Sequence, residues 1–258
     1  MIPKTIHYCW FGGKPLPEDV RDYIDTWRRH CPDYEIKEWN ESNFDLDLYP
    51  FVRQAYDAKK FAFVADVVRL YALFHEGGIY MDTDVEVLKS FDPFLGHTAF
   101  GGYEDDTRVT TGVMGAVKGS EWARENLDYY RGRRFLLPDG SPDTTINVEI
   151  ITAAMEKKGL RRDNTFQDFK DWFTIYPKDY FCPKSHVDGR VRVTPNTVVI
   201  HHFAGTWLSP LEAESIRIAR RLSWIPEHRR YLVSKFFATL RMEGIRATLA
   251  QTVRRLRR

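Results

Sequence analysis

Residues 77–84 of this 258-residue chain read GGIYMDTD. The two glycines suit the end of a helix, because a residue in the left-handed conformation commonly follows the last helical turn. The apolar run at residues 79–81 predicts a short buried strand. Alternate side chains of a strand point to the same side, so Asp82 and Asp84 can converge where this strand ends. The stretch therefore predicts the end of a helix, a buried strand and a pair of carboxylates in succession.

Two carboxylates at this spacing indicate a metal site, because neighbouring negative charges stay ionised together only when a cation or hydrogen-bond donors lie between them. Oxygen ligands favour a hard ion such as Mg²⁺ or Mn²⁺. Open α/β sheets bind their ligands beyond the carboxyl ends of the strands, which is where Asp82 and Asp84 are expected. An ion held there can bind a diphosphate. A solvated acidic turn is the alternative for an isolated Asp-x-Asp sequence.

Other candidate residues lie at a helix and at two strand ends. Asp66 and Arg69 share one face of a helix predicted over Phe61–Glu76, a spacing that an ordinary surface ion pair also has. Trp10 lies beside a glycine turn, where its ring can stack on a nucleobase or simply belong to the core. His201 and His202 end a later predicted strand, where an imidazole is either a further metal ligand or a structural side chain.

The rest of the chain alternates strand and helix patterns, which predicts an α/β fold. Further strands are expected at Thr5–Phe11, Tyr34–Trp39, Ala99–Tyr103, Thr110–Ala116, Arg190–Val193 and Val198–His202, and further helices at Pro17–His30, Ser120–Arg131 and Thr145–Lys158. The composition changes near residue 209, where Arg and apolar residues begin to dominate. We therefore expect a catalytic domain over residues 1–208 and a basic, helical extension over residues 209–258.

The composition is that of an ordinary globular chain, with 43% hydrophobic and 29% charged residues. Its three cysteines are too few to indicate a disulfide framework or a zinc cluster. Neither a signal peptide nor a run long enough to span a bilayer is evident in the sequence. These features predict a cytoplasmic location or peripheral attachment to the inner face of the plasma membrane.

The C-terminal segment, residues 217–258, contains twelve Lys or Arg and two Asp or Glu. Apolar residues recur there at helical spacing, at Met242, Ile245, Leu249, Val253 and Leu256. Such a helix packs on the catalytic domain or lies on an anionic membrane, where each basic residue near the surface contributes about 1 kcal/mol. Nucleic acid is not expected as a partner, because no nucleic-acid-binding motif accompanies the basic segment.

Three stretches together resemble one known family. Residues 65–84 are similar to the sugar-binding region of the DXD glycosyltransferases, which include bacterial capsule and lipopolysaccharide sugar transferases and fungal initiating α-1,6-mannosyltransferases. The similarity extends more distantly to the glucosyltransferase domains of large clostridial toxins. Residues 2–13 resemble the first strand of these enzymes and residues 201–207 their closing motif, with Thr206 in place of a common serine. Residues 104–190 carry no motif that aligns.

This resemblance implies a GT-A fold, which is a Rossmann-like mixed sheet that binds a nucleotide sugar and is flanked by helices. It implies a Mn²⁺ or Mg²⁺ ion and a nucleotide-sugar donor, with a UDP-hexose favoured over the GDP-mannose of the fungal enzymes. The implied acceptor is a saccharide or a lipid-linked saccharide in surface polysaccharide synthesis. The reaction is expected to retain the anomeric configuration.

The resemblance also implies donor-binding residues by position. Trp10 is expected to stack on the base, and Trp207 to close over the diphosphate. Tyr80 is expected to line the donor pocket. The full expected set of donor-binding residues is Tyr8, Trp10, Gly12, Asp66, Arg69, Tyr80, Asp82, Thr83 and Trp207.

Four residues are expected to carry the chemistry by the same resemblance. Asp66 and Arg69 would hold the donor sugar and the diphosphate, and Asp84 would bind the metal directly. Asp82 would contact the ribose, the sugar or a water on the metal. The implied metal ligands are Asp82, Asp84 and one of two histidines, His201 or His202, with His202 favoured by the sequence His-Phe-Ala-Gly.

Two chemical routes give retention. A carboxylate nucleophile can form a covalent intermediate, as in retaining glycosidases. Alternatively, the acceptor attacks from the side of the leaving group and the leaving phosphate acts as the base, which is the route that we favour. The candidates for a nucleophile rest on location alone, and they are Asp105, Asp106, Asp143 and Glu149.

Two other classes of protein compete with this interpretation. A phosphohydrolase of the haloacid-dehalogenase type also places a DxD sequence after an apolar strand, but usually the first strand, whereas about 80 residues precede it here. A non-catalytic module that binds sugar or membrane does not need Asp66, Arg69, Asp82 and Asp84 together. Release of phosphate from simple esters would favour the phosphohydrolase, and metal-dependent hydrolysis of nucleotide sugars would favour the transferase.

Overall fold

The computed structural model describes residues 1–186, 189–205, 210–222, 224–225 and 227–256. They form two compact units, which we describe separately. The first unit comprises Met1–Lys184 and Val191–His202, and the second comprises Ser185–Arg190 and Phe203–Arg258. The second unit thus begins a few residues before the expected boundary at residue 209 and also takes in a short earlier segment.

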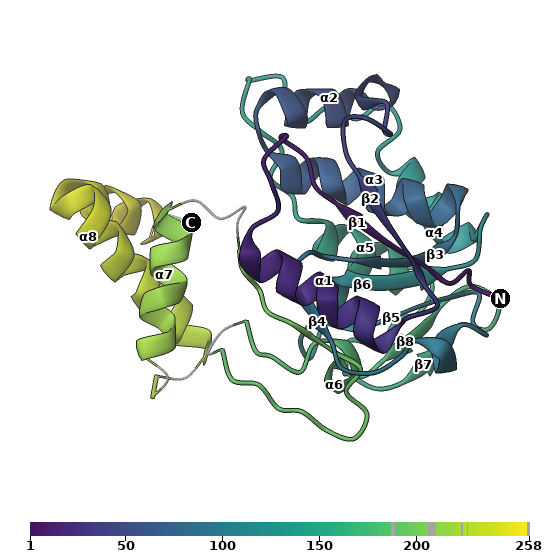
Figure 1. The fold of residues 1–258 in the computed structure, drawn as a ribbon. Coiled ribbons are helices and arrows are strands. Elements are labelled where there is room, and N and C mark those ends of the chain that lie inside the picture. The colour runs from purple at the N-terminus through teal and green to yellow at the C-terminus, as the bar shows by residue number, and fades with distance from the viewer. Residues whose placement is uncertain (187–188, 206–209, 223, 226, 257–258) are drawn as a thin grey trace. The chain divides into compact units, whose positions relative to one another are not determined.

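A seven-stranded mixed sheet in the order β2-β1-β3-β6-β5-β8-β7 forms the centre of the first unit (Figure 1). Its strands are β1 (Thr5–Cys9), β2 (Glu35–Trp39), β3 (Gly78–Met81), β5 (Ala99–Tyr103), β6 (Val109–Ala116), β7 (Gln167–Asp168) and β8 (Thr174–Tyr176). Strand β1 runs parallel to β2 and β3, whereas β6 is antiparallel to both β3 and β5. With helices flanking this sheet, the predicted α/β fold is confirmed.

The helices of the first unit are α1 (Glu18–His30), α2 (Pro50–Asp57), α3 (Phe61–His75), α4 (Glu121–Asp128), α5 (Asn147–Glu156) and α6 (Lys178–Phe181). Two single 3₁₀ turns lie at Leu46–Leu48 and Asp92–Phe94. Helix α3 is apolar over most of its surface and belongs to one hydrophobic core, while α1 belongs to another. Strand β3 joins the two cores, because Tyr80 packs in the first and Ile79 and Met81 pack in the second.

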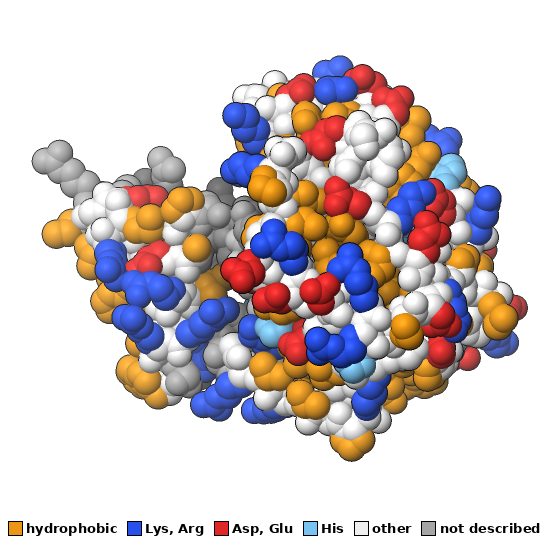
Figure 2. Space-filling view, viewed as in Figure 1, with side chains coloured by type: hydrophobic (Ala, Val, Ile, Leu, Met, Phe, Trp, Pro, Cys, Tyr) orange, Lys and Arg blue, Asp and Glu red, His pale blue; other side chains and the backbone are white. Residues whose placement is uncertain are grey.

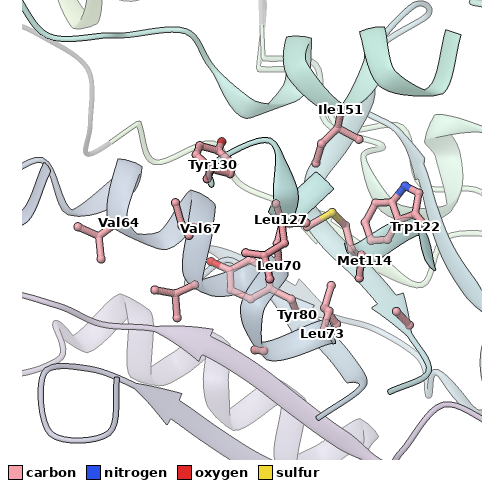
Figure 3. Packing of buried hydrophobic residues seen from close by; sticks show 14 of the residues in the cluster. Val64, Val67, Leu70, Leu73, Tyr80, Met114, Trp122, Leu127, Tyr130 and Ile151 are labelled. Atoms are coloured by element: carbon pink, nitrogen blue, oxygen red, sulfur yellow. The ribbon is translucent and has the colours of Figure 1, made fainter. Parts of the chain in front are cut away.

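The core around α3 holds the acidic strand in place. Val67, Leu70 and Leu73 of α3 lie near Tyr80 of β3 and Met114 of β6 (Figure 3). All five side chains are almost completely buried. At about 25 cal/mol per Å² of apolar surface, burial of each such side chain contributes roughly 1.5–3 kcal/mol. The end of β3 is therefore fixed from within the sheet and from the helix above it.

A separate two-stranded sheet pairs β4 (Val85–Val87) with β9 (Val199–His201) in antiparallel fashion. Val85 is the register partner of His201. Since β4 begins directly after the Asp82-Thr83-Asp84 sequence, this pairing brings the far end of the first unit to the acidic residues.

The predicted elements agree with the structure for the long, periodic segments, with ends that differ by up to three residues. The strand expected at Arg190–Val193 is not formed, because Val191 makes only an isolated bridge with Lys184. The elements that sequence patterns missed are short, and they are α2, α6, β4, β7 and β8. Two or three residues are too few to show the periodicity that predicts a strand. These short strands form because they pair with other strands.

The second unit contains α7 (Pro210–Arg221) and α8 (Glu227–Leu256). Helix α8 is interrupted at Gly244, whose φ of 82° is non-helical. Glu214 of α7 ties the two helices together, since its carboxylate accepts from Arg217 on its own helix and from Arg241 of α8. The side chains of Leu249, Val253 and Leu256, on which part of the predicted apolar stripe rests, lie outside the described residues.

Among the residues that the structure describes, none of the helices combines the length and the apolar character that a membrane crossing requires.

Candidate functional site

The carboxyl ends of β1 and β3 lie at the same edge of the sheet, because the two strands are parallel. Asp82 follows β3 directly, and its backbone N–H donates to the Gly112 carbonyl of β6 at 2.9 Å. The next backbone bond runs from the Val85 N–H to the Asp82 carbonyl at 3.2 Å and closes a turn. This turn places Asp82 and Asp84 at the sheet edge, as the sequence predicts.

Asp82, Asp84 and His201 form a cluster whose ligand atoms all lie within 4.8 Å of one another. His201 Nε2 is 3.2 Å from Asp84 Oδ1 and 3.9 Å from Asp82 Oδ2. The histidine is buried and the two aspartates are partly exposed, so the cluster opens to solvent on the carboxylate side. Two carboxylate oxygens and one imidazole nitrogen are a ligand set that suits Mn²⁺ and related divalent ions.

The electrostatics of His201 also fit a cation site. The pKa of His201 lies well above its ordinary value. Burial acts to lower this pKa, but the nearby Asp84 carboxylate raises it by more. A positive charge at this position is therefore favoured. A divalent ion would supply that charge in place of the proton, so metal binding at Asp82, Asp84 and His201 is expected to release a proton. The Cys182 thiol also interacts with the imidazole.

His202 lies on the other side of its strand, which corrects the preference for His202 over His201. Its Nε2 is 2.9 Å from Glu86 Oε2, and its ring stacks on Tyr23 with centroids 4.8 Å apart. Successive side chains of a strand face opposite sides, so only one of two neighbouring histidines can face the acidic pair. The register of β9 on β4 selects His201.

Arg69 and Asp66 are brought to the same edge by α3, and both are buried. Arg69 Nη2 lies 3.2 Å from Asp66 Oδ1 and 3.3 Å from Asp82 Oδ1. Its Nη1 donates to the Thr111 carbonyl at 2.7 Å. Burial raises the pKa of Asp66 to about 7, while Arg69 acts in the opposite direction. Arg69 thus neutralises charge on both Asp66 and Asp82. The alternative that Asp66 and Arg69 form an ordinary surface ion pair is wrong, because both are buried.

Tyr80 completes the support of Asp82. Its hydroxyl donates to Asp82 Oδ1 at 2.8 Å, and the Arg69 guanidinium lies 4.7 Å from the centre of its ring. One oxygen of Asp82 is therefore held by Tyr80 and Arg69, which leaves Oδ2 on the side of His201. Tyr80 is almost fully buried, so the role that this structure shows for it is to fix Asp82.

The predicted residues of the first strand have clear structural roles. The Tyr8 hydroxyl donates to Glu38 at 2.6 Å, and its buried ring packs edge-on against Trp27. Trp10 is partly buried, and its Nε1 donates to the Lys14 carbonyl at 2.6 Å. Gly12 has a φ of +96°, and a Cβ there would come within 2.4 Å of the Phe61 ring, so glycine is required for the fold. Contact of these residues with a donor stays a prediction.

Two further predicted residues complete the list. Thr83 lies between the two aspartates and is partly exposed. Trp207, like Thr206 in the proposed closing motif, lies outside the described residues.

Gly112 is a site residue that sequence reasoning missed. A Cβ on Gly112 would lie 2.8 Å from His201 Cε1 and Nδ1 and 3.2 Å from Asp82 Oδ2. The signal was present, because a glycine inside a strand often marks close approach of another group. The register between β5 and β6 also shifts between Gly101 and Tyr103, and such irregularities are frequent beside active sites.

The four carboxylates considered as nucleophiles already have basic partners. Asp105 binds Arg108 at 2.7 Å, Asp106 pairs with Lys178, and Asp143 lies 3.9 Å from Arg133. Glu149 is 46% exposed and lies 3.6 Å from Arg108. Their neighbour Glu104, which sequence reasoning did not single out, is largely buried.

Residues 17–101 match the model of the family described as "Glycosyltransferase sugar-binding region containing DXD motif". This matched stretch is similar to the sugar-binding region of the DXD glycosyltransferases. The Asp-x-Asp sequence Asp82-Thr83-Asp84 lies within the matched residues, and the match favours a glycosyltransferase over the phosphohydrolase alternative.

Fungal proteins similar to this chain include inositol phosphoceramide mannosyltransferase 3 of Schizosaccharomyces pombe, which is 33% identical over 122 residues, or 46% of this chain and 34% of the relative. A mannosyl phosphorylinositol ceramide synthase of Saccharomyces cerevisiae is 30% identical over 125 residues, or 45% of this chain and 31% of the relative. The matched part of the chain thus spans about a third of the length of these relatives.

Solved structures with a similar chain course include PaToxG glycosyltransferase, which is 22% identical over 61% of this chain and 70% of that chain, with a TM-score of 0.46. The galactosyltransferase LgtC is 15% identical over 88% of this chain and 99% of that chain, with a TM-score of 0.41.

Proposed function

We propose that this chain is a divalent-metal-dependent glycosyltransferase that moves a hexose from a nucleotide sugar to a hydroxyl group of its acceptor. The observation that carries the proposal is the cluster of Asp82, Asp84 and His201 at the carboxyl edge of the sheet. The family match supports it, because the matched region contains both aspartates.

The reaction breaks the bond between the anomeric carbon and the diphosphate, and negative charge develops on the departing phosphate oxygen. A divalent ion held by Asp82, Asp84 and His201 would stabilise that charge as a Lewis acid. Arg69 and Tyr80 hold one oxygen of Asp82, so the carboxylate cannot rotate away. A site fixed in advance contributes more to catalysis than one that must reorganise during the reaction.

Two nucleotide sugars are candidate donors, a UDP-hexose and GDP-mannose. The resemblance favours a UDP-hexose, whereas the names of the fungal relatives favour a mannosyl donor such as GDP-mannose. We retain UDP-hexose as the proposal. The experiment is to incubate the full chain with Mn²⁺ and separately with UDP-glucose, UDP-galactose and GDP-mannose, and to measure the nucleoside diphosphate released.

The function predicts release that requires the metal and is abolished by EDTA. Asp82→Asn and Asp84→Asn should lower the rate by at least about 100-fold, because each removes a charged ligand. Leu48→Ser, on the exposed surface of the same unit, is the control. If the double variant Asp82→Asn, Asp84→Asn kept wild-type turnover and metal affinity, the proposal would be wrong.

The acceptor is proposed to be a saccharide or the headgroup of a glycolipid. The names of the fungal relatives refer to inositol phosphoceramide, and they support an acceptor that is linked to lipid. Surface polysaccharide synthesis and retention of configuration are part of the same proposal. Transfer to lipid extracts, followed by NMR of the new anomeric linkage, tests acceptor and stereochemistry together.

Attachment to an anionic bilayer through the second unit is proposed as well. Trp224 and Ile245 are 78% and 67% exposed, and Met242 is also exposed. Figure 2 shows Lys and Arg side chains beside hydrophobic ones on the visible face of this unit. Hydrophobic insertion combined with basic residues is what binds a peripheral helix to anionic lipid.

Vesicles that contain phosphatidylserine should sediment the full chain, and vesicles of phosphatidylcholine alone should not. Met242→Ser with Ile245→Ser should weaken this binding, whereas Leu48→Ser in the first unit should leave it unchanged. Equal binding of the double variant and the wild type would exclude these side chains from the attachment.

A further inference from the structure

A groove lies between the two helices of the second unit, α7 and α8, which pack against each other (Figure 1). Its volume is about 440 Å³, which is within the range of roughly 300–1,000 Å³ that is common for ligand pockets. Each side of the groove supplies two apolar side chains and one arginine within about one helical turn. The lining residues are Ile218, Arg221 and Leu222 on the α7 side and Phe237, Leu240 and Arg241 on α8.

The apolar part of this lining is open to solvent. Phe237 is 47% exposed, although its ring packs edge-on against that of Phe236 with centroids 5.6 Å apart. Ile218, Leu222 and Leu240 are each partly exposed. Apolar side chains that are exposed together are stabilised when another apolar group covers them. The groove therefore suits a ligand that has a hydrocarbon portion.

Two guanidinium groups line the same groove. Arg241 Nη1 lies 3.1 Å from Glu214 Oε1, a carboxylate that Arg217 also binds at 2.6 Å. Arg221 is exposed, and it forms no ion pair within the part of the chain that the structure describes. One carboxylate for three guanidinium groups leaves an excess of positive charge at the groove. This charge favours a ligand with an anionic head group.

Exposed apolar residues that adjoin the groove in the sequence extend its surface. Trp224 follows Leu222 by two residues, and Met242 directly follows Arg241. Both of these side chains are exposed. Tryptophan is enriched where a membrane meets water, because its ring is amphipathic. The groove is thus flanked by the kind of side chain that reaches into a lipid surface.

We propose that this groove binds one hydrocarbon chain of an anionic phospholipid, with the phosphate group of the lipid at Arg221 and Arg241. The inference deepens the proposed membrane attachment, on which it rests. Beyond lying on an anionic surface, the second unit would hold one individual lipid molecule. The hydrocarbon chain covers the apolar lining, and the phosphate neutralises the excess positive charge.

The probe is decyl phosphate, an anionic amphiphile with a single chain, added below its critical micelle concentration to the full chain. Isothermal titration calorimetry should show one molecule bound per protein chain. Decanol, which has the same hydrocarbon chain without the charge, should bind at least about 10-fold more weakly, because the two arginines then lose their partner. Inorganic phosphate should not bind measurably. Equal affinity for phosphate and decyl phosphate would overturn the role of the apolar lining.

Two phenylalanines of α8 provide a matched pair of variants. Phe237→Ser should raise the Kd for decyl phosphate at least about 10-fold, because this ring lines the groove. Phe236→Ser is the control, since this neighbouring ring is 43% exposed but is not part of the lining. Its Kd should stay within about twofold of the wild-type value. Equal Kd values in the two variants would overturn the proposal.

Two arginines of α7 provide a second pair, in exposed side chains whose loss does not threaten the fold. Arg221→Gln should raise the Kd about fivefold, because it removes one charge from the groove. Arg220→Gln removes the same charge from the adjacent, exposed residue outside the lining and should leave the Kd unchanged. An equal effect of both would assign the binding to overall charge and would contradict the groove.

A wild type that binds no decyl phosphate would also overturn the inference. If Phe237→Ser then converted a dimer to a monomer in light scattering, the groove would belong to a second copy of the chain. Sedimentation with phosphatidylserine vesicles distinguishes this failure from that of the membrane attachment. A chain that sediments but does not bind decyl phosphate loses only the groove, and a chain that does neither loses the attachment as well. Release of nucleoside diphosphate tests the transferase function separately.

Discussion

Gly112 lies directly against the imidazole of His201. A Cβ on Gly112 would be 2.8 Å from His201 Cε1 and Nδ1, closer than side-chain atoms pack, and 3.2 Å from Asp82 Oδ2. The backbone of the same residue accepts the hydrogen bond from the Asp82 N–H. One glycine of β6 thus both positions Asp82 and leaves the space that His201 occupies.

Gly112→Ala should therefore push the His201 ring away from the two aspartates. We expect a loss of Mn²⁺ affinity of about 10- to 100-fold, as is typical when the residues that orient a metal ligand are changed. Isothermal titration with Mn²⁺ measures it. Gly96→Ala is the control, because a Cβ there meets no atom within 4 Å. Unchanged affinity in Gly112→Ala would mean that His201 does not bind the metal.

The two adjacent histidines should differ sharply in their effect on metal binding. His201→Asn should weaken Mn²⁺ binding by at least about 10-fold, since it removes a ligand. His202→Asn should leave Mn²⁺ affinity near that of the wild type, because His202 faces Glu86 and Tyr23. Mn²⁺ electron paramagnetic resonance distinguishes the two variants, and the reverse order would contradict the assignment.

Arg69→Lys should destabilise the first unit although the charge is kept. Lysine cannot reach Asp66, Asp82 and the Thr111 carbonyl together, and it loses the stacking on Tyr80. We expect a loss of about 1–3 kcal/mol in the free energy of unfolding, because buried polar groups are left without partners. Urea unfolding measures it. Arg124→Lys, on the exposed face of α4, should cost little, and equal effects would refute the buried network.

Stability should fall at mildly acidic pH because of His7. This fully buried ring lies 2.7 Å from the Gly77 carbonyl through Nε2 and accepts from the Trp39 Nε1–H through Nδ1 at 3.1 Å, so it must be neutral with the proton on Nε2. Burial lowers the pKa of His7 in the folded state. The unfolded chain therefore binds the proton more readily, and stability is lost as the pH falls below about 6.5.

Urea unfolding of the wild type and of His7→Gln at pH 7.5 and pH 5.5 tests this dependence. Glutamine can keep the bond to the Gly77 carbonyl but does not titrate. The wild type should lose more unfolding free energy between the two pH values than the variant does. The same loss in both proteins would assign the pH dependence to other groups.

Local sequence determined much of this protein. The apolar face of α3, the two glycines after it and the alternation of β3 predict a helix, a buried strand and the placement of Asp82 and Asp84 at its end, because these features depend on neighbouring residues. The spacing of Asp66 and Arg69 likewise predicts one shared helix face. The family resemblance added the expected chemistry.

Only the tertiary structure decided which distant residues join the acidic pair. His201 and His202 are equivalent in sequence, and a shift of one residue in the pairing of β9 with β4 would exchange them, because strand side chains alternate. Gly112 reaches the cluster through the antiparallel pairing of β6 with β3. Register between strands far apart in the chain depends on packing of the whole core, which the pattern within a single segment does not specify.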